Sequence, residues 1–219
     1  MNANKAVCHI VAAADFDPRY FAPRKGDFII AADAGLLHLK KLKISPDLVL
    51  GDFDSVGFVP TEGRVERIPV KKDFTDSHYA LMRAKELGFD AAVLYGCTGG
   101  KRFDHSLANL EALLWAEENG LRAFMIGAGF CMSAIKGASL SFPAKKLETL
   151  SLFPFCGTVE NVSAKNCLYE LENAQLSPTE TLAVSNSSEG SAVISSPDGA
   201  ILVYWDFHPG DELPKYKRF

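Results

Sequence analysis

The sequence predicts an α/β N-terminal domain with an open, mostly parallel sheet, followed by an all-β C-terminal domain that forms a sandwich. Up to about residue 127, short runs that are apolar on both faces alternate with helical patterns, which is typical of parallel sheets covered by helices. Beyond about residue 130, strand-like runs follow one another at close spacing and no helical pattern occurs. We therefore expect domains at residues 1–132 and 133–219.

Five buried strands and three helices are expected in the first domain. The strands are the apolar runs AVCHIVAAA (6–14), DFIIAAD (27–33), DLVLGD (47–52), AAVLYG (91–96) and RAFMIGA (122–128). The helices are AGLLHLKKL (34–42), DSHYALMRAKELG (76–88) and HSLANLEALLWAEENG (105–120). The last two helices end at Gly88 and Gly120, because glycine commonly closes a helix.

The second domain is predicted to consist of strands joined by the turn signals NSSEG and SPDG. The expected strands are TLSLFPF (149–155), GTVENV (157–162), ETLAVSN (180–186), GSAVISS (190–196) and AILVYW (200–205). Runs at this spacing favour a separate β-sandwich over an extension of the first sheet. We expect the boundary between Gly129 and Gly137. MIGAGF (125–130) is interpreted as a turn, because a dinucleotide-binding loop needs a third glycine and a following helix.

Composition favours a small-molecule partner. The chain has 219 residues, 47% of them hydrophobic, and a net charge of −4 without a long basic run, which argues against a nucleic-acid surface. No apolar run approaches the roughly 20 residues that cross a bilayer, and the N-terminus lacks signal-peptide features, so a cytoplasmic location without membrane attachment is expected. The five cysteines are scattered and show no CxxC spacing, which indicates neither a disulfide framework nor a zinc site.

Aspartates follow several of the expected strands. Asp33 follows FIIAA, Asp52 and Asp54 follow LVLG, and Asp76 opens a helix. Ligands of an open α/β sheet bind beyond the carboxyl ends of its strands, where these side chains should gather. Taken singly, several polar residues here also fit helix N-caps, namely Asp73, Thr75, Asp76, Asp104 and Ser106.

The pair Asp52 and Asp54 indicates a metal site. Two ionised carboxylates that turn toward one point repel each other unless a positive charge lies between them. Oxygen ligands select a hard cation, and Mg²⁺ typically combines one or two carboxylates with waters and substrate phosphates. The pair therefore predicts Mg²⁺ and a phosphorylated substrate.

The glycine-rich stretch GCTGGKRFDHSLANL (96–110) indicates an anion site. Its glycines let backbone N–H groups approach an anion, and Lys101 and Arg102 add positive charge in front of a helix N-terminus. The stretch is not a Walker A loop, because the spacing of its glycines and the residue after the lysine differ. His105 and Asn109 lie one helical turn apart and can face the site, although a cap or packing role fits His105 equally well.

Four motifs in this order resemble thiamine pyrophosphokinases: AADAG (31–35), PDLVLGDFDS (46–55), KDFTDSHYAL (72–81) and GGKRFDHSLANL (99–110). The resemblance continues through LYEL (168–171) and LAVSNSSEG (182–190). It implies an N-terminal ATP-binding catalytic domain, a C-terminal thiamine-binding β-sandwich, and a homodimer with active sites where the subunits meet. It also implies Mg²⁺-dependent transfer of the pyrophosphoryl group of ATP to the hydroxyethyl oxygen of thiamine, with release of AMP.

The resemblance assigns roles to individual residues. It implies that Asp52, Asp54 and Asp76 bind the metal. The implied catalytic residues are Asp52, Asp54, Asp76, Arg102 and Asp104. The implied residues for binding ATP or thiamine are Asp33, Asp73, Thr75, Gly99, Gly100, Lys101, His105, Asn109, Ser185 and Asn186. Lys101 is an extra residue relative to the commoner glycine-glycine-arginine form.

Several assignments stay open at this point. Either Asp76 or Asp104 orients or deprotonates the attacking alcohol. Trp205 is a candidate for stacking on thiamine, with burial in the core as the alternative, and Tyr169 is a weaker candidate. The motif DFDSV also fits a haloacid-dehalogenase-like phosphatase with Asp52 as nucleophile. A non-catalytic protein that binds thiamine or a nucleotide is the third alternative.

Overall fold

The computed structural model describes residues 5–54, 57–61 and 63–219. Contacts divide the chain into two compact units that meet in the sequence between Ala128 and Gly129. We call them the N-terminal unit and the C-terminal unit and describe each by itself. None of the helices in the described ranges is long and apolar enough to cross a bilayer.

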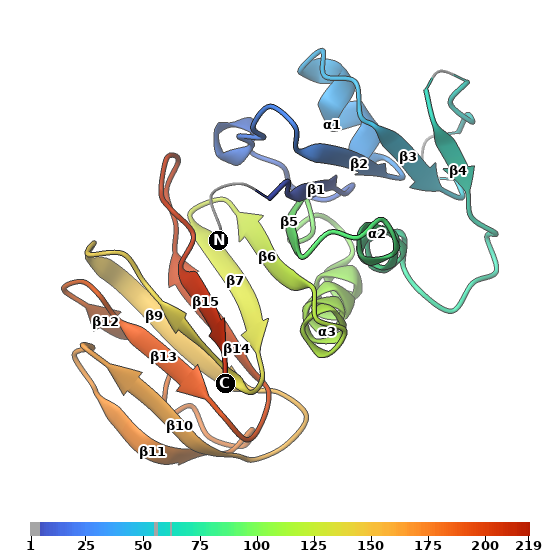
Figure 1. Ribbon diagram of the computed structural model, residues 1–219. Coiled ribbons are helices and arrows are strands. Elements are labelled where there is room, and N and C mark those ends of the chain that lie inside the picture. Colours follow the sequence, from blue (N-terminus) through green and yellow to red (C-terminus); the bar gives the residue numbers. More distant parts are fainter. Residues whose placement is uncertain (1–4, 55–56, 62) are drawn as a thin grey trace. The chain divides into compact units, whose positions relative to one another are not determined.

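The N-terminal unit contains a parallel sheet with the strand order β6-β5-β1-β2-β3-β4 (Figure 1). Its strands are β1 (Cys8–Val11), β2 (Phe28–Ala32), β3 (Leu48–Gly51), β4 (Val65–Arg67), β5 (Ala91–Tyr95) and β6 (Arg122–Gly127). The centre of the sheet is apolar: Ile10 pairs with Ile30 on one side and Leu94 on the other, and all three are fully buried. The predicted parallel α/β architecture is confirmed for this unit.

Three α-helices cover the sheet, and a short 3-10 helix, η1 (Pro18–Tyr20), precedes β2. They are α1 (Gly35–Lys41), α2 (Asp76–Glu86) and α3 (Phe103–Glu118). Figure 1 shows α1 on one face of the sheet and α2 with α3 on the other. Right-handed crossovers require this arrangement, because β2 to β3 and β5 to β6 step across the sheet in opposite directions.

The helix ends follow local chemistry. The Thr75 hydroxyl accepts a hydrogen bond from the His78 N–H at 3.3 Å and so caps α2. The predicted cap of α3 by Asp104 or Ser106 is wrong, because α3 begins earlier, at Phe103, and its N-cap residue Arg102 makes no side-chain cap bond.

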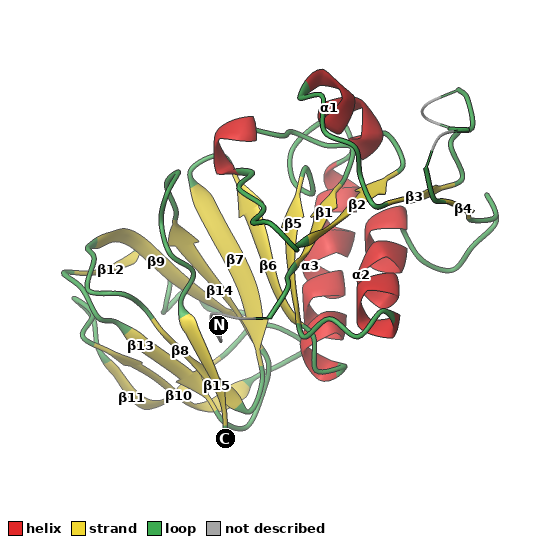
Figure 2. Ribbon diagram, turned by 45° about the horizontal axis from the view of Figure 1, so that its top comes forward, coloured by secondary structure: helices red, strands yellow, loops and turns green. Residues whose placement is uncertain are grey.

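The C-terminal unit contains two sets of hydrogen-bonded antiparallel strands, as Figure 2 shows, with the orders β12-β9-β14-β7 and β11-β10-β13-β8-β15. Their strands are β7 (Phe130–Ile135), β8 (Ala138–Ser141), β9 (Leu147–Pro154), β10 (Val159–Lys165), β11 (Leu171–Leu176), β12 (Asn186–Ser188), β13 (Val193–Ser196), β14 (Ile201–Asp206) and β15 (Lys215–Arg218). The buried Trp205 ring on β14 meets the Phe142 ring beside β8, with centroids 5.2 Å apart. The prediction of an antiparallel all-β region is confirmed.

One predicted strand is wrong and several strands were not predicted. Residues 180–185 of ETLAVSN form turns, with a hydrogen bond from the Val184 N–H to the Thr181 carbonyl, and only Asn186 enters a strand. The strands β4, β7, β8, β11 and β15 lie outside the predicted runs. Most of them are short or rich in small and polar residues, so their sequences lack the sustained apolar run that marks a buried strand.

Candidate active site

A pocket of about 620 Å³ lies in the N-terminal unit, beyond the carboxyl ends of the parallel strands. Residues directly after β1, β2, β3 and β5 line it, and β1 is the strand at which the chain order of the sheet reverses. This is the position that open α/β sheets use for ligands. The pocket brings together twelve of the predicted site residues: Asp33, Asp52, Asp54, Asp73, Thr75, Asp76, Gly99, Gly100, Lys101, Arg102, His105 and Asn109.

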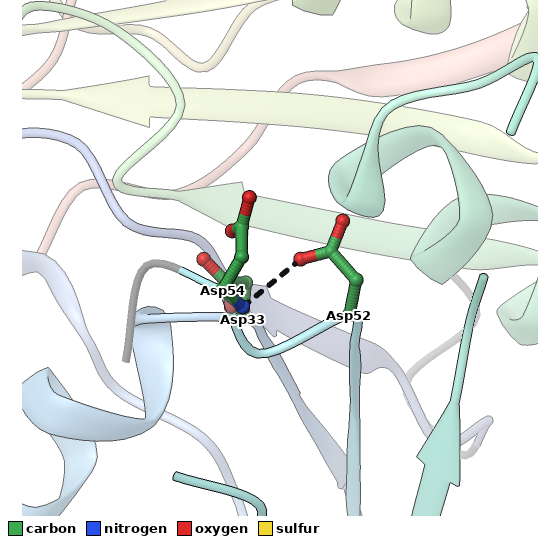
Figure 3. A group of neighbouring side chains, drawn as sticks. All are labelled: Asp33, Asp52 and Asp54. Atoms are coloured by element: carbon green, nitrogen blue, oxygen red, sulfur yellow. Dashed lines mark hydrogen bonds between the residues drawn. The ribbon is translucent and has the colours of Figure 1, made fainter. Parts of the chain in front are cut away.

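Three carboxylates converge in this pocket. Asp33, Asp52 and Asp54 each offer an oxygen, and these oxygens lie within 4.8 Å of one another (Figure 3). The Asp54 N–H also donates a hydrogen bond of 3.3 Å to Asp52 Oδ1. The pair Asp52 and Asp54 thus turns toward one point, as predicted, while its third partner in the cluster is Asp33. The assignment of Asp76 to the metal stays a prediction.

The backbone between the two aspartates explains why they face the same way. Phe53 adopts a left-handed conformation, φ +64°, and its side chain is 3% exposed. Burial of the ring anchors the turn in the core, which offsets the strain of a non-glycine residue at positive φ. Gly51 allows this turn to approach Asp33, because a Cβ at Gly51 would lie 3.0 Å from the Asp33 Cα. Asp33 itself has φ +48°.

The cluster has the properties of a cation site. Asp33 is 6% exposed, and its Oδ1 is buried without a hydrogen-bond partner among the described residues. A buried carboxylate oxygen without a donor is costly unless a cation or water satisfies it. The all-oxygen donor set suits a hard divalent ion such as Mg²⁺, so the residues present fit the metal that the sequence predicts.

Lys72, which sequence reasoning missed, supplies a cation inside the pocket. Its ammonium donates to Asp52 Oδ2 at 2.8 Å and to Asp76 Oδ1 at 2.6 Å. The Lys72 side chain is 11% exposed, and those of Asp52 and Asp76 are 8% and 22% exposed. The only signal in the sequence was the pair of lysines directly before the DFTD segment.

The ion pairs shift the pKa values of these groups. Burial raises the pKa of Asp52, but hydrogen bonds from Lys72 and from the Asp54 N–H outweigh it, so this pKa lies below its usual range. For Asp76, burial outweighs the attraction of Lys72 and the pKa is raised. Burial alone would lower the pKa of Lys72. Its two carboxylate partners raise this pKa by more than burial lowers it, so the net shift is upward and the ammonium stays charged.

The glycine-rich loop forms another wall of the pocket. Gly99 and Gly100 have φ of +80° and +70°, and a Cβ at Gly99 would lie 2.1 Å from Asp15 Oδ2. The Asp15 carboxylate, which we did not predict, accepts the Gly100 N–H at 3.1 Å. This bond fixes the loop backbone close to the residues after β1.

Arg102 and Asp104 form an exposed pair outside the carboxylate cluster. The guanidinium donates to both Asp104 oxygens, at 2.9 and 2.6 Å, and holds the pKa of that carboxyl at about 2. Arg102 lines the pocket, whereas Asp104 is not among its lining residues.

Asn109 links three elements beneath the pocket. It is 4% exposed, and its Oδ1 accepts the hydroxyl proton of Ser77 in α2. Its Nδ2 donates to the Cys97 carbonyl, two residues after β5, at 2.7 Å. Both ends of the amide are therefore engaged within the protein, and the role of Asn109 in binding ATP stays a prediction.

The predicted residues of the C-terminal unit also have defined surroundings. Asn186 is buried and pairs with the backbone of Tyr169, accepting its N–H at 3.0 Å and donating to its carbonyl at 2.7 Å. The Tyr169 residue is 66% exposed, and Ser185 has φ +63°. Trp205 is 1% exposed, which supports the interpretation of this residue as part of the core.

Two family models match the chain, and together they cover most of it. The model described as thiamin pyrophosphokinase, catalytic domain, matches residues 23–125. The model described as thiamin pyrophosphokinase, vitamin B1 binding domain, matches residues 139–201. No curated protein sequence matches at a significant level.

Solved structures share the fold. The thiamine pyrophosphokinase from Bacillus subtilis gives a TM-score of 0.79 at 24% identity, covering 91% of this chain and 98% of that chain. The thiamin pyrophosphokinase from Geobacillus thermodenitrificans gives 0.77 at 24% identity, covering 94% and 100%. Yeast thiamin pyrophosphokinase gives 0.72 at 14% identity, covering 94% and 88%. Likeness at such low identity establishes the architecture and leaves the chemistry to be argued from the site.

Proposed function

The chain belongs to the thiamin pyrophosphokinase family, and on that premise we propose that it uses Mg²⁺ to transfer the pyrophosphoryl group of ATP to thiamine. Membership of the family makes the chain a thiamine diphosphokinase. The products of the proposed reaction are thiamine diphosphate and AMP. The use of ATP and Mg²⁺ is proposed from the residues that line the pocket of the N-terminal unit.

The observation that carries the proposal is the cluster of Asp33, Asp52 and Asp54 in one pocket with the glycine-rich loop. The Oδ1 of Asp33, which has no hydrogen-bond partner among the residues that the structure describes, marks this cluster as a place for a cation. The loop supplies Lys101 and Arg102, whose charges complement phosphate oxygens. A pocket that combines this carboxylate cluster with the cations of the glycine-rich loop suits a nucleotide polyphosphate that arrives with its metal.

The cluster would hold Mg²⁺, with Asp76 beside it. When bound, Mg²⁺ neutralises part of the negative charge on the phosphate oxygens. Arg102 stabilises the charge that grows on the oxygens of the transferred group. Such a reaction depends on alignment of the two reactants and on neutralisation of charge more than on covalent help from the protein.

Asp76 is the proposed base. The thiamine hydroxyl oxygen forms a bond to the β-phosphorus of ATP, the bond from that phosphorus to the bridging α,β oxygen breaks, and AMP leaves with the electron pair. The hydroxyl proton passes to the Asp76 carboxylate, which lines the pocket and has a raised pKa. Asp104 is less suited, because Arg102 holds its pKa at about 2 and it does not line the pocket.

The remaining proposals concern thiamine and assembly. Ser185 and Asn186 in the C-terminal unit are proposed to contribute to thiamine binding. A homodimer with its active sites at the subunit interface is proposed on the same family premise. Cytoplasmic location stays a prediction from the sequence.

An assay for AMP tests the proposed function. The protein is incubated with ATP, with thiamine present or omitted and with Mg²⁺ present or removed by a chelator. We expect AMP only when thiamine and Mg²⁺ are both present. Phosphate release without an acceptor would indicate the phosphatase alternative with Asp52 as nucleophile, and thiamine binding without AMP would indicate a non-catalytic binding protein.

A further inference from the structure

The carboxylates of the pocket already hold a cation that belongs to the protein. The Lys72 ammonium lies between Asp52 and Asp76, within hydrogen-bond distance of both. Its side chain is 11% exposed, so bulk water screens the charge only weakly.

Lys72 and a divalent ion use the same carboxylate. Asp52 belongs to the cluster with Asp33 and Asp54, and its Oδ2 accepts a hydrogen bond from the Lys72 ammonium. A metal bound to this cluster would therefore lie close to a fixed positive charge. Like charges at this range repel, and the ammonium also withdraws electron density from a metal ligand.

Phosphate oxygens offer Lys72 a second set of acceptors. Its charge sits on a flexible four-carbon stem with three donors, so it can change partners without a change in the backbone. Lys72 lines the same pocket as Lys101 and Arg102, the other two cations proposed for the nucleotide. A polyphosphate in the pocket would draw the ammonium away from Asp52.

We propose that Lys72 is a positioning residue that couples metal binding to nucleotide binding. In the free protein its ammonium neutralises Asp52 and Asp76 and keeps the affinity of the cluster for a divalent ion low. When the nucleotide enters, Lys72 moves from Asp52 to a phosphate oxygen and releases the carboxylate for the metal. This inference rests on the proposed function, because it assumes that the cluster binds the metal of the reaction.

Metal binding without nucleotide tests the first half of the proposal. Mn²⁺ replaces Mg²⁺, and free Mn²⁺ is measured by electron paramagnetic resonance. We expect Lys72→Gln to bind Mn²⁺ about tenfold more tightly than the unsubstituted protein, because one nearby positive charge is removed. Lys72→Arg keeps the charge and should retain the weak affinity. Lys71→Gln is the matched control. Lys71 is exposed, so water and salt screen its charge, and removal of that charge should change the Mn²⁺ affinity little.

The coupling itself is measured by repeating the titration with α,β-methylene-ATP, whose α,β bridge resists transfer. In the unsubstituted protein the analogue should increase Mn²⁺ affinity more than it does in Lys72→Gln, because the inhibitory charge has already been removed from the variant. Equal enhancement in the two proteins would overturn the proposal. So would an unchanged or weaker Mn²⁺ affinity of nucleotide-free Lys72→Gln.

A measurement on the unsubstituted protein covers the case in which Lys72→Gln does not fold. With ¹³C-labelled lysine, the Lys72 Cε resonance should shift little with Mg²⁺ alone and clearly with Mg²⁺ plus the analogue. A resonance that does not respond to the ternary complex contradicts the proposed movement. Failure of the proposed function looks different: the unsubstituted protein and both Lys72 variants would then bind no Mn²⁺, with or without the analogue.

Discussion

At the scale of single residues, the pocket depends on the turn formed by Asp52, Phe53 and Asp54. The Phe53 ring is buried, and the two carboxylates stand on either side of it in the sequence. Phe53 lies in the core, and its left-handed backbone leaves Asp52 and Asp54 directed toward Asp33. The turn follows directly after the short strand β3, whose last residue is Gly51, so it lies at the carboxyl edge of the sheet. The strain in the backbone is therefore linked to the geometry of the cluster.

The double variant Asp52→Asn, Asp54→Asn tests the role of these carboxylates. The turnover rate should fall by about 10² or more, because the variant loses two charges that are proposed to hold the metal and orient the phosphates. The fold should persist, since Phe53 still anchors the turn, and circular dichroism can verify this. Asp90→Asn, in the same unit and with a side chain that is 44% exposed, should leave the rate unchanged. Near-normal turnover of the double variant would remove the metal role.

The types and order of the residues predicted that aspartates gather in the pocket. They did not predict the ion pairs that Lys72 forms there with Asp52 and Asp76. Asp33, Asp52 and Asp54 follow apolar runs, and parallel strands place such residues at one edge. Lys72 lies in an irregular segment between β4 and α2, where no periodicity indicates the direction of a side chain. The sequence therefore predicted a need for positive charge and assigned all of it to a metal, although Lys72 provides part of it.

At the scale of elements, α2 and α3 contact each other, and a buried amide joins them to the loop after β5. Asn109 in α3 pairs with Ser77 near the start of α2 and with the Cys97 carbonyl. All three residues are less than 8% exposed. This connection fixes the start of α2, which carries Asp76, relative to the glycine-rich loop.

Asn109→Ala should lower the free energy of unfolding by about 2 kcal/mol, because the Ser77 hydroxyl and the Cys97 carbonyl each lose a buried hydrogen bond to the Asn109 amide. Urea unfolding followed by circular dichroism measures the change. Asn119→Ala provides a control at the exposed end of the same helix and should cost about 0.5 kcal/mol or less. If Asn109→Ala were as stable as Asn119→Ala, the proposed role of Asn109 in joining α2, α3 and the loop after β5 would be contradicted.

The elements themselves were predictable where one physical signal dominated. The five central parallel strands and the helices α2 and α3 have sustained patterns and clear ends at glycines. By contrast, β15 is polar along most of its length and β11 along half of it, and their strand conformation depends on pairing with β8 and β10. These partner strands are separate segments of the sequence, so the hydrophobic pattern within β11 or β15 does not reveal the pairing.

At the scale of the whole molecule, one buried and one half-buried histidine link stability to pH. His9 lies between the Asp27 carboxylate and the Tyr95 hydroxyl, 3.1 Å from each. Burial lowers its pKa, and this outweighs the attraction of Asp27. Burial also lowers the pKa of His78, which packs on Trp115. Both side chains are therefore more easily protonated in the unfolded chain than in the folded one.

The free energy of unfolding should decrease as the pH falls below about 6.5, the ordinary histidine value, toward the lowered values of the folded state. The contribution is complete above that pH, because both states are then neutral. Urea unfolding at several pH values measures the slope, which should be smaller in His9→Gln and unchanged in His208→Gln, at an exposed position. An identical slope in His9→Gln would contradict the assignment to His9.

In the proposed reaction, a pyrophosphoryl group passes in one piece from ATP to thiamine. Phosphorus-31 NMR of a reaction containing the protein, ATP, thiamine and Mg²⁺ tests it most directly, because every phosphorus product has its own resonance. We expect AMP and thiamine diphosphate in equal amounts, with neither ADP nor free phosphate. Formation of ADP with thiamine monophosphate, or of inorganic phosphate, would contradict it.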